Sequence, residues 1–176
     1  MKKTKIVSAF PACGKSYIFD NMKSIDCVDS DSSQFSWIID EHGKSTGMRN
    51  PDFPNNYKGH IDSLVGKVDF IFVSSHKEVR DMLTESGYNW ISVMPHRDMK
   101  NEWIGRCFVR GSGEKFCKML QDNWEMWVPE QHNMSTVQGA CGWVTLQHNK
   151  HLSDSTDFIE TLPYNNKEEN ILDVHS

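Results

Sequence analysis

The first sixteen residues constrain the fold more than any other part of the chain. Residues 5–10 form a short apolar run that ends at a turn, which is typical of a buried strand. Gly14-Lys15-Ser16 follows at once and begins a helical pattern that continues to about Lys23. A strand that passes within a few residues into a helix begins a β-α unit. Such units favour a parallel sheet covered by helices.

The rest of the chain continues this alternation. We predict further strands at residues 25–29, 68–73, 90–94 and 143–146, and helices at about 57–66, 77–86 and 114–128. Residues 40–56 are rich in Gly, Pro, Asn and charge, so we predict an irregular loop there. We expect residues 1–162 to form one α/β domain with a five-stranded parallel sheet, followed by a polar, frayed tail at 163–176.

Composition narrows the classes of protein that remain. The chain has 176 residues, which suits one compact domain, and a formal net charge of -5, which argues against broad non-specific binding to nucleic acid or anionic membranes. Its five cysteines are odd in number and no pair has Cys-x-x-Cys spacing, so a disulfide framework or structural zinc site is not expected. The apolar stretch after the basic N-terminus is too short for a signal peptide. We therefore expect a cytoplasmic protein with reduced thiols.

Residues 9–16 match the pattern G-x-x-x-x-G-K-[ST], except that Ala9 replaces the first glycine. In this motif the backbone N–H groups form an anion nest, and the helix that begins there adds its positive dipole end. Lys15 would bring charge to the β and γ phosphates, Ser16 would offer a hydroxyl to magnesium, and Gly14 would let the backbone approach. We predict a site for ATP and Mg²⁺ whose nucleotide contacts are Ala12, Cys13, Gly14, Lys15, Ser16 and Tyr17. The alternative is a chance Gly-Lys-Ser at a helix start.

Asp29-Ser30-Asp31 follows the second predicted strand. Ligands of open α/β sheets bind at the carboxyl ends of the strands, so these carboxylates are expected near the phosphate loop. One of them could hold magnesium through water, and the other could accept a proton from an attacking hydroxyl. The alternative is a helix cap that leads into residues 34–39.

With these two motifs the chain resembles the small P-loop kinases, a group that includes nucleoside monophosphate, shikimate, gluconate and polynucleotide kinases. The resemblance covers about residues 5–128. It implies a three-layer P-loop NTPase fold with strand order 2-3-1-4-5. It also implies that Asp29 helps to hold magnesium and that Asp31 contacts the acceptor hydroxyl. The chain is also similar to uncharacterised kinase-like proteins of bacteriophages and their hosts, through Arg49-Asn50-Pro51, Ser74-Ser75-His76 and the Arg106/Arg110 pair.

The same resemblance implies a mobile lid at about residues 96–111 and an acceptor-binding insertion at about 32–57. Arg106 and Arg110 are four residues apart and share one helix face, from which they would stabilise charge on the transferred phosphoryl group. Arg97 belongs to the same segment. In the insertion, Arg49 would bind a phosphate or carboxylate of the acceptor. The alternatives are a solvated basic face for the lid arginines and an ordinary surface loop for Arg49.

The end of the third predicted strand lacks the carboxylate that P-loop enzymes usually carry there. Ser75 and His76 follow this strand, whereas Asp69 stands at its start, on the wrong side for a ligand cleft. Asp29 or Asp31 would have to take the missing role. The eight histidines are scattered without ligand spacing, so no transition-metal site is expected.

These features together predict an ATP-dependent phosphotransferase that acts on a nucleotide or nucleoside. The similarity to phage kinase-like proteins implies a deoxynucleoside monophosphate as the leading acceptor and a phage-encoded enzyme in a host cytoplasm as the setting. A kinase for a 5′-hydroxyl nucleic-acid end or for a small hydroxylated metabolite is an alternative, although the acidic net charge disfavours long nucleic acid. A nucleotide-dependent switch and a catalytically inactive nucleotide-binding protein are further alternatives.

Overall fold

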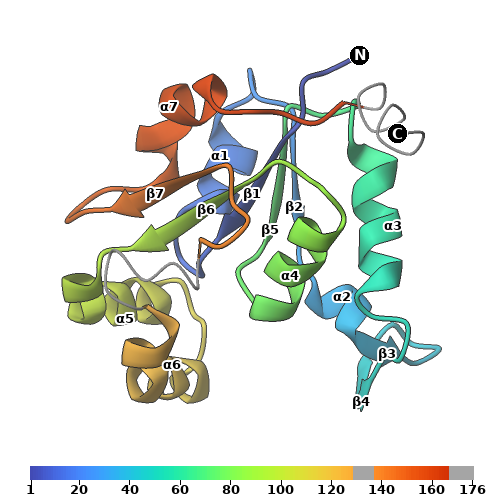
Figure 1. Ribbon diagram of the computed structural model, residues 1–176. Helices are drawn as coiled ribbons and strands as arrows, with labels where there is room; N and C mark the ends of the chain where they lie inside the picture. Colours follow the sequence, from blue (N-terminus) through green and yellow to red (C-terminus); the bar gives the residue numbers. More distant parts are fainter. Residues whose placement is uncertain (129–136, 167–176) are drawn as a thin grey trace.

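The computed structural model describes residues 1–128 and 137–166. Within them, five parallel strands form one sheet: β1 (Lys5–Ala9), β2 (Cys27–Ser30), β5 (Phe70–Ser74), β6 (Trp90–Pro95) and β7 (Gly142–Leu146) (Figure 1). The spatial order is β2-β5-β1-β6-β7. Counted along the chain over this sheet alone, the order is 2-3-1-4-5, as the sequence analysis expected.

Helices follow the strands and cover both faces of the sheet. The α-helices are α1 (Lys15–Asn21), α2 (Ser33–Ser36), α3 (Asn55–Leu64), α4 (Lys77–Glu85), α5 (Lys100–Val109), α6 (Glu114–Trp127) and α7 (Thr156–Thr161), and the 3-10 turns are η1 (Arg97–Met99) and η3 (Leu152–Ser155). The helices expected at 57–66, 77–86 and 114–128 are confirmed, with ends shifted by no more than two residues. The sequence analysis did not predict α7.

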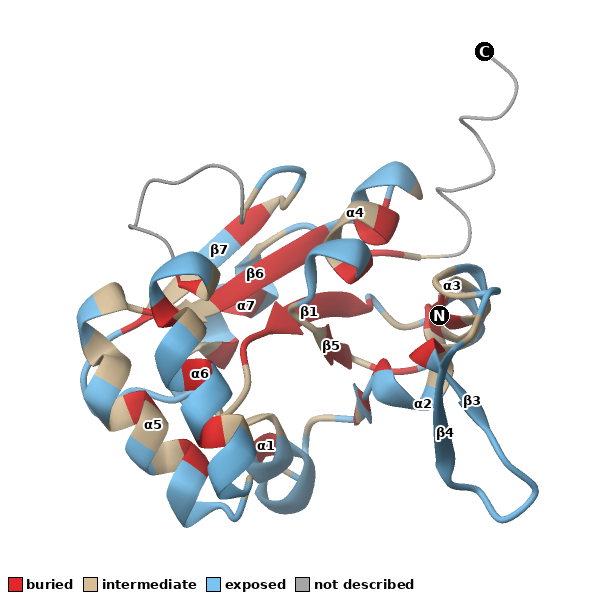
Figure 2. Ribbon diagram, turned by 90° about the horizontal axis from the view of Figure 1, so that it is seen from below, coloured by how far each residue is buried: buried red, intermediate tan, exposed pale blue. Residues whose placement is uncertain are grey.

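The pleat of the strands divides the buried side chains into two clusters. Val7 of β1 and Phe72 of β5 belong to a cluster with residues of α1, α5, α6 and α7, whereas Ile6 and Ile71 belong to a cluster with residues of α3 and α4. Figure 2 shows α1 and α4 on opposite sides of the strands. Successive side chains of a strand point to opposite faces, so a strand that is apolar at every position needs a helical layer on each side.

The structure corrects the prediction of an irregular loop at residues 40–56. Residues 37–39 (β3, Trp37–Ile39) and 45–49 (β4, Ser45–Arg49) pair as an antiparallel hairpin. Both strands are exposed along their whole length, as the pale blue colour in Figure 2 shows. The hairpin has no buried face, so its sequence lacks the apolar alternation by which a strand is usually recognised.

The prediction of a frayed tail at residues 163–176 is also wrong at Asn165. Asn165 is buried and pairs with Thr4 through backbone hydrogen bonds in both directions, at 2.8 and 3.1 Å. Its side-chain amide accepts from the N–H of Asn89 (2.9 Å) and donates to the carbonyl of Asn89 (2.8 Å). An amide side chain carries both a donor and an acceptor, so it can satisfy both groups of a backbone residue. The remainder of the predicted tail, 167–176, lies outside the described residues.

Among the residues that the structure describes, no helix has the length and apolar character needed to cross a membrane.

Candidate active site

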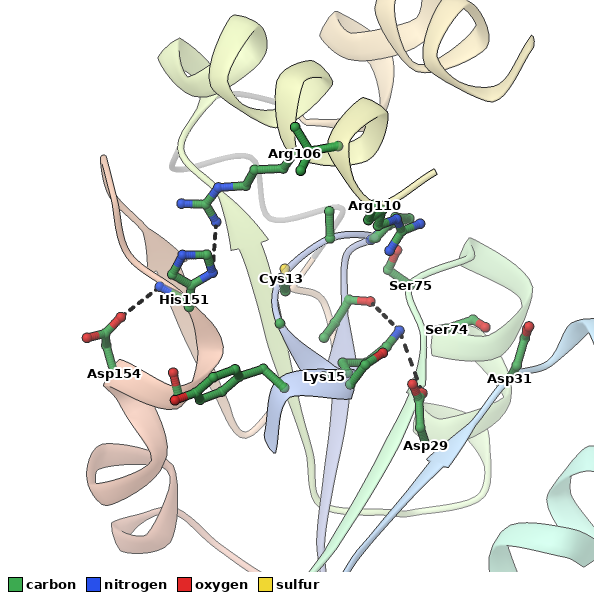
Figure 3. A pocket seen from close by; sticks show the side chains of 18 of the residues that line it. Cys13, Lys15, Asp29, Asp31, Ser74, Ser75, Arg106, Arg110, His151 and Asp154 are labelled. Carbon is green, nitrogen blue, oxygen red and sulfur yellow. Dashed lines mark hydrogen bonds and ion pairs between the residues drawn. The ribbon is translucent and has the colours of Figure 1, made fainter. Parts of the chain in front are cut away.

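A cavity of about 1020 Å³ lies at the carboxyl end of the parallel strands. Its walls come from the loop after β1, the ends of β2 and β5, helix α5 with the start of α6, and residues 149–154 after β7 (Figure 3). This volume is large enough for a nucleotide-sized ligand. Ten of the residues that the sequence analysis predicted for the site line this cavity: Ala12, Cys13, Gly14, Lys15, Ser16, Tyr17, Asp29, Asp31, Arg106 and Arg110.

The loop after β1 has the backbone form of an anion nest. Ala12 and Gly14 have positive φ angles of 63° and 101°, and such left-handed residues turn successive N–H groups toward one point. The N–H groups of Gly14, Lys15 and Ser16 donate to no acceptor within the described residues. A side chain at Gly14 would be strained by its φ angle, so this position favours glycine for a backbone reason.

Cys13 contributes its backbone to this loop, and its thiol is not available as a nucleophile. The thiol is buried, and its sulfur lies 3.9 Å from the carbonyl oxygen of Val93. Burial raises the pKa of Cys13 to about 12, so the thiol stays protonated at neutral pH.

Lys15 lies between the phosphate loop and the second strand. Its Nζ is 3.5 Å from the carbonyl oxygen of Ala9 and 4.0 Å from Oδ1 of Asp29. These contacts hold the ammonium group inside the cavity and beside the unpaired N–H groups of the loop (Figure 3). The prediction that the carboxylates after the second strand lie near this loop agrees with the position of Asp29.

The two aspartates of the acidic loop have different surroundings. Burial is the largest influence on Asp29 and raises the pKa of its carboxyl group, against the opposing effects of Lys15 and Arg110. Asp31 accepts a hydrogen bond of 2.9 Å from the N–H of Ser33, at the start of α2. Ser32, the N-cap residue of α2, makes no side-chain capping hydrogen bond, so of the predicted Asp/Ser cap only the Asp31 contact is present. Asp31 also lines the cavity, so this contact does not exclude a role there.

Ser74, Ser75 and His76, at the end of β5, line the same cavity. Burial is the largest influence on His76 and lowers its pKa, so its imidazole is neutral at neutral pH. Asp69 lies at the opposite end of β5, where its carboxylate pairs with Lys2 at 3.0 Å. This position confirms that Asp69 cannot take the role of the missing carboxylate.

The residues of the cavity suit magnesium only if a bound nucleotide supplies part of its ligands. No group of three or more His, Cys, Asp or Glu side chains in the described ranges could hold a metal ion. Magnesium bound with a nucleotide usually takes one or two protein ligands and completes its shell with phosphate oxygens and water. Ser16 and Asp29, which both line the cavity, are the oxygen donors suited to that arrangement.

The expected lid corresponds to η1 and α5, and its arginines differ in placement. Arg106 and Arg110 line the cavity, whereas Arg97 forms an ion pair with Glu125 of α6. Arg49, predicted to bind the acceptor, is not among the lining residues. Its guanidinium pairs with Glu78 and lies 4.7 Å from the centre of the Phe53 ring.

The sequence analysis missed one wall of the cavity, formed by Asn149, His151, Ser153 and Asp154. The N–H of Leu152 donates to the carbonyl of Cys13 at 2.8 Å, which ties this segment to the phosphate loop. One signal was present in the sequence: a polar run follows the last predicted strand, at the same edge of the sheet as Asp29.

The raised pKa of Asp29 predicts that the stability difference between the wild type and Asp29→Asn depends on pH. A carboxyl group whose folded pKa lies above its unfolded value binds more protons in the folded state, so its contribution to stability falls as pH rises through that window. We expect Asp29→Asn to raise the thermal midpoint relative to the wild type. The gap should widen as pH rises from about 4, near the usual Asp value of 3.8, toward 7. Thermal unfolding followed by circular dichroism at several pH values measures this, and a gap that narrows with rising pH would contradict it.

Comparison with protein-family models finds no match to this chain, and no curated protein matches it. Its function must therefore be inferred from the chemistry of the cavity.

Proposed function

We propose that this chain is a P-loop NTPase-type phosphotransferase that moves the γ-phosphoryl group of ATP to a small acceptor, with Mg²⁺ as cofactor. One observation carries the proposal. The Lys15 ammonium group lies 4.0 Å from the Asp29 carboxylate, in a cavity bordered by a backbone nest with unpaired N–H groups. Donors for phosphate and an oxygen ligand for magnesium thus meet at one point.

Each lining residue has a distinct task in this reaction. The loop N–H groups and Lys15 bind the β and γ phosphates, and Ser16 and Asp29 bind magnesium, which neutralises phosphate charge when it is bound. Asp31 orients the attacking oxygen of the acceptor as the new oxygen–phosphorus bond forms and the bond to the β-phosphate oxygen breaks. Where that oxygen belongs to a hydroxyl group, Asp31 also accepts its proton. Arg106 and Arg110 face the negative charge of the transferred group.

The pair of carboxylates favours an enzyme over a nucleotide-dependent switch. A switch needs only one carboxylate for magnesium, whereas this cavity contains both Asp29 and Asp31. The second carboxylate suits a proton acceptor for an incoming substrate. The fold alone would not decide between the two, because P-loop folds serve many functions.

The leading acceptor is a nucleotide or nucleoside, with a deoxynucleoside monophosphate first. An acceptor phosphate requires a cation, and Arg49 would have to exchange Glu78 for that phosphate. The position of Asp31 supports a second candidate, an acceptor that attacks through a neutral hydroxyl group. Such an acceptor would be a 5′-hydroxyl end or a small hydroxylated metabolite, and it would not need Arg49.

A screen of acceptors with ATP and Mg²⁺ tests the proposal. The panel contains ribo- and deoxynucleoside monophosphates, nucleosides, 5′-hydroxyl oligonucleotides and small polyols, and the readout is ADP formed together with phosphorylated product. We expect at least one acceptor to raise ADP formation well above the rate with ATP alone. ATP binding without acceptor-stimulated turnover across the panel would favour the switch instead.

Arg49→Ala then separates the two acceptor classes. For a nucleoside monophosphate we expect KM of the acceptor to rise by about tenfold or more while the affinity for ATP is unchanged, because Arg49 does not line the cavity. Glu78→Ala is the matched control, since it removes the partner of Arg49 and leaves the guanidinium free. Unchanged acceptor KM in Arg49→Ala would contradict binding of an anionic acceptor by this residue.

A further inference from the structure

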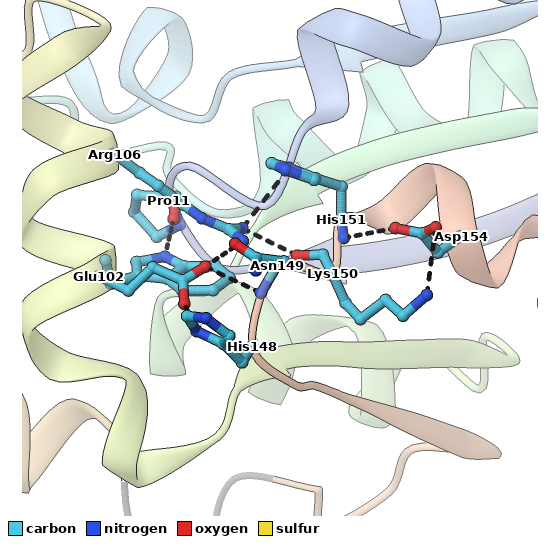
Figure 4. A network of polar contacts seen from close by, with 9 residues as sticks. Pro11, Glu102, Arg106, His148, Asn149, Lys150, His151 and Asp154 are labelled. Carbon is cyan, nitrogen blue, oxygen red and sulfur yellow. Dashed lines mark hydrogen bonds and ion pairs between the residues drawn. The ribbon is translucent and has the colours of Figure 1, made fainter.

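The guanidinium of Arg106 is held in place before any ligand arrives. Its Nη2 donates to Oε1 of Glu102 at 2.5 Å, and its Nη1 donates to the carbonyl of Lys150 at 2.9 Å and lies 3.5 Å from Nδ1 of His151 (Figure 4). The group also lies over the ring of Trp103, 4.2 Å from its centre. An arginine has five N–H donors, so donors remain for a phosphate in the cavity.

Glu102 is the centre of this arrangement. Besides Arg106, its Oε1 accepts from the N–H of Asn149 at 3.2 Å, and its Oε2 contacts Nδ1 of His148. Burial alone would raise the pKa of Glu102, but the hydrogen bonds from Arg106, Asn149 and His148 outweigh it and lower that pKa. One ionised carboxylate therefore joins helix α5 to the segment after β7.

Helix α5 is also joined to the phosphate loop. Trp103 is fully buried, and its indole N–H donates to the carbonyl of Pro11 at 2.7 Å. The segment after β7 reaches the same loop through the hydrogen bond from Leu152 to Cys13. The phosphate loop, α5 and residues 148–152 thus form a closed ring of contacts around Arg106. At the turn of α5 that carries Glu102, Trp103 and Arg106, the helix is therefore attached to the rest of the site.

Arg110, one turn further along, is held much less firmly. Its Nε donates to Oγ of Ser112 at 2.6 Å, and within the described residues its terminal nitrogens have no acceptor. It nevertheless lines the cavity, and its charge acts on Asp29. Gly111 and Gly113 follow it with positive φ angles of 79° and 81°. The guanidinium of Arg110 is therefore held by fewer contacts than that of Arg106 and is freer to change its orientation.

We propose that Glu102 is a positioning residue that fixes Arg106 in its phosphate-facing orientation, a constraint that Arg110 lacks. The inference rests on the proposed function, because it assigns Arg106 to phosphate. A guanidinium that is already oriented stabilises developing charge without reorganisation during the reaction. Glu102 needs no contact with the substrate to act in this way.

Glu102→Ala tests the role of Glu102, with Glu125→Ala as the matched control. Glu125 also pairs with an arginine of the lid segment, Arg97, but does not line the cavity. We expect Glu102→Ala to lower kcat by about tenfold or more, with a smaller change in KM for ATP, since displacing a catalytic group by about 1 Å can cost about a hundredfold. Glu102→Gln keeps one oxygen acceptor, so its kcat should lie between that of Glu102→Ala and that of the wild type. Glu125→Ala should match the wild type.

The double variant Glu102→Ala/Arg106→Ala separates positioning from general stability. If Glu102 acts through Arg106, the double variant should be no slower than Arg106→Ala alone. Losses that multiply, or wild-type kcat in Glu102→Ala, would overturn the proposal.

A measurement without nucleotide distinguishes failure of this inference from failure of the proposed function. Amide hydrogen exchange of the apo protein should show loss of protection at Asn149 in Glu102→Ala and not in Glu125→Ala. If that loss is seen but the wild type neither binds nor turns over ATP, the proposed function is wrong and the ring of contacts is structural. Unchanged protection at Asn149 would show that Glu102 positions nothing.

Discussion

Lys15→Ala is expected to abolish phosphoryl transfer from ATP while leaving the fold intact. Its Nζ lies 4.0 Å from Oδ1 of Asp29 and 3.5 Å from the carbonyl oxygen of Ala9, and Lys15 is a member of neither buried apolar cluster. The ammonium group supplies positive charge where charge develops on the transferred group. Loss of one such contact costs on the order of a hundred- to a thousandfold in kcat. Steady-state kinetics with the best acceptor measures the loss.

Lys23→Ala provides the control for this prediction. Lys23 follows α1 and its Nζ donates to the carbonyl of Phe19 at 3.3 Å on the exposed surface. We expect wild-type turnover from Lys23→Ala and near-wild-type thermal midpoints from both variants. Transfer at the wild-type rate in Lys15→Ala would refute the assignment of the phosphate loop. A large fall in its thermal midpoint would instead point to a structural role for Lys15.

Asp31→Asn is expected to lower turnover by about a hundredfold or more, the usual scale for a lost acid–base group, and Asp29→Asn is expected to lower it by a similar factor because it removes the charge of the proposed magnesium ligand. Asparagine has the size of aspartate and removes its charge. At position 31 it can still accept the hydrogen bond from the N–H of Ser33, so the start of α2 should survive. The comparison therefore tests the charge and not the helix cap. ATP binding should persist at least in part, because the nest and Lys15 are unchanged.

Magnesium dependence distinguishes the two aspartates. If Asp29 helps to hold magnesium, higher Mg²⁺ should restore part of the turnover of Asp29→Asn, whereas Asp31→Asn should not respond because it lacks the proton acceptor. Asp26→Asn, changed at the other end of β2, should behave as wild type, since Asp26 pairs with Lys2 away from the cavity. Normal turnover in both Asp29→Asn and Asp31→Asn would show that the acidic loop acts only as a helix cap.

Much of the sheet could be predicted because its strands carry their own signal. A strand buried on both faces is apolar at nearly every position, as residues 68–73 and 90–94 are, and local pattern is enough to recognise it. The hairpin of β3 and β4 has no buried face and gives no such pattern. Asn165 was missed for a related reason. It resembles any polar residue of a tail until Thr4 and Asn89 are brought beside it.

The candidate site divides in the same way. The sequence by itself located the loop of residues 9–16 and its neighbouring carboxylates, because a nest, a lysine and a strand-end aspartate belong to short segments whose geometry is local. Only the tertiary structure decided which distant residues join them. It placed residues 149–154 in the cavity, paired Arg49 with Glu78 outside it, and joined the Glu102–Arg106 pair of α5 to residues 148–150. Contacts between segments 29 or more residues apart depend on how the helices pack on the sheet, and no local pattern in either segment specifies them.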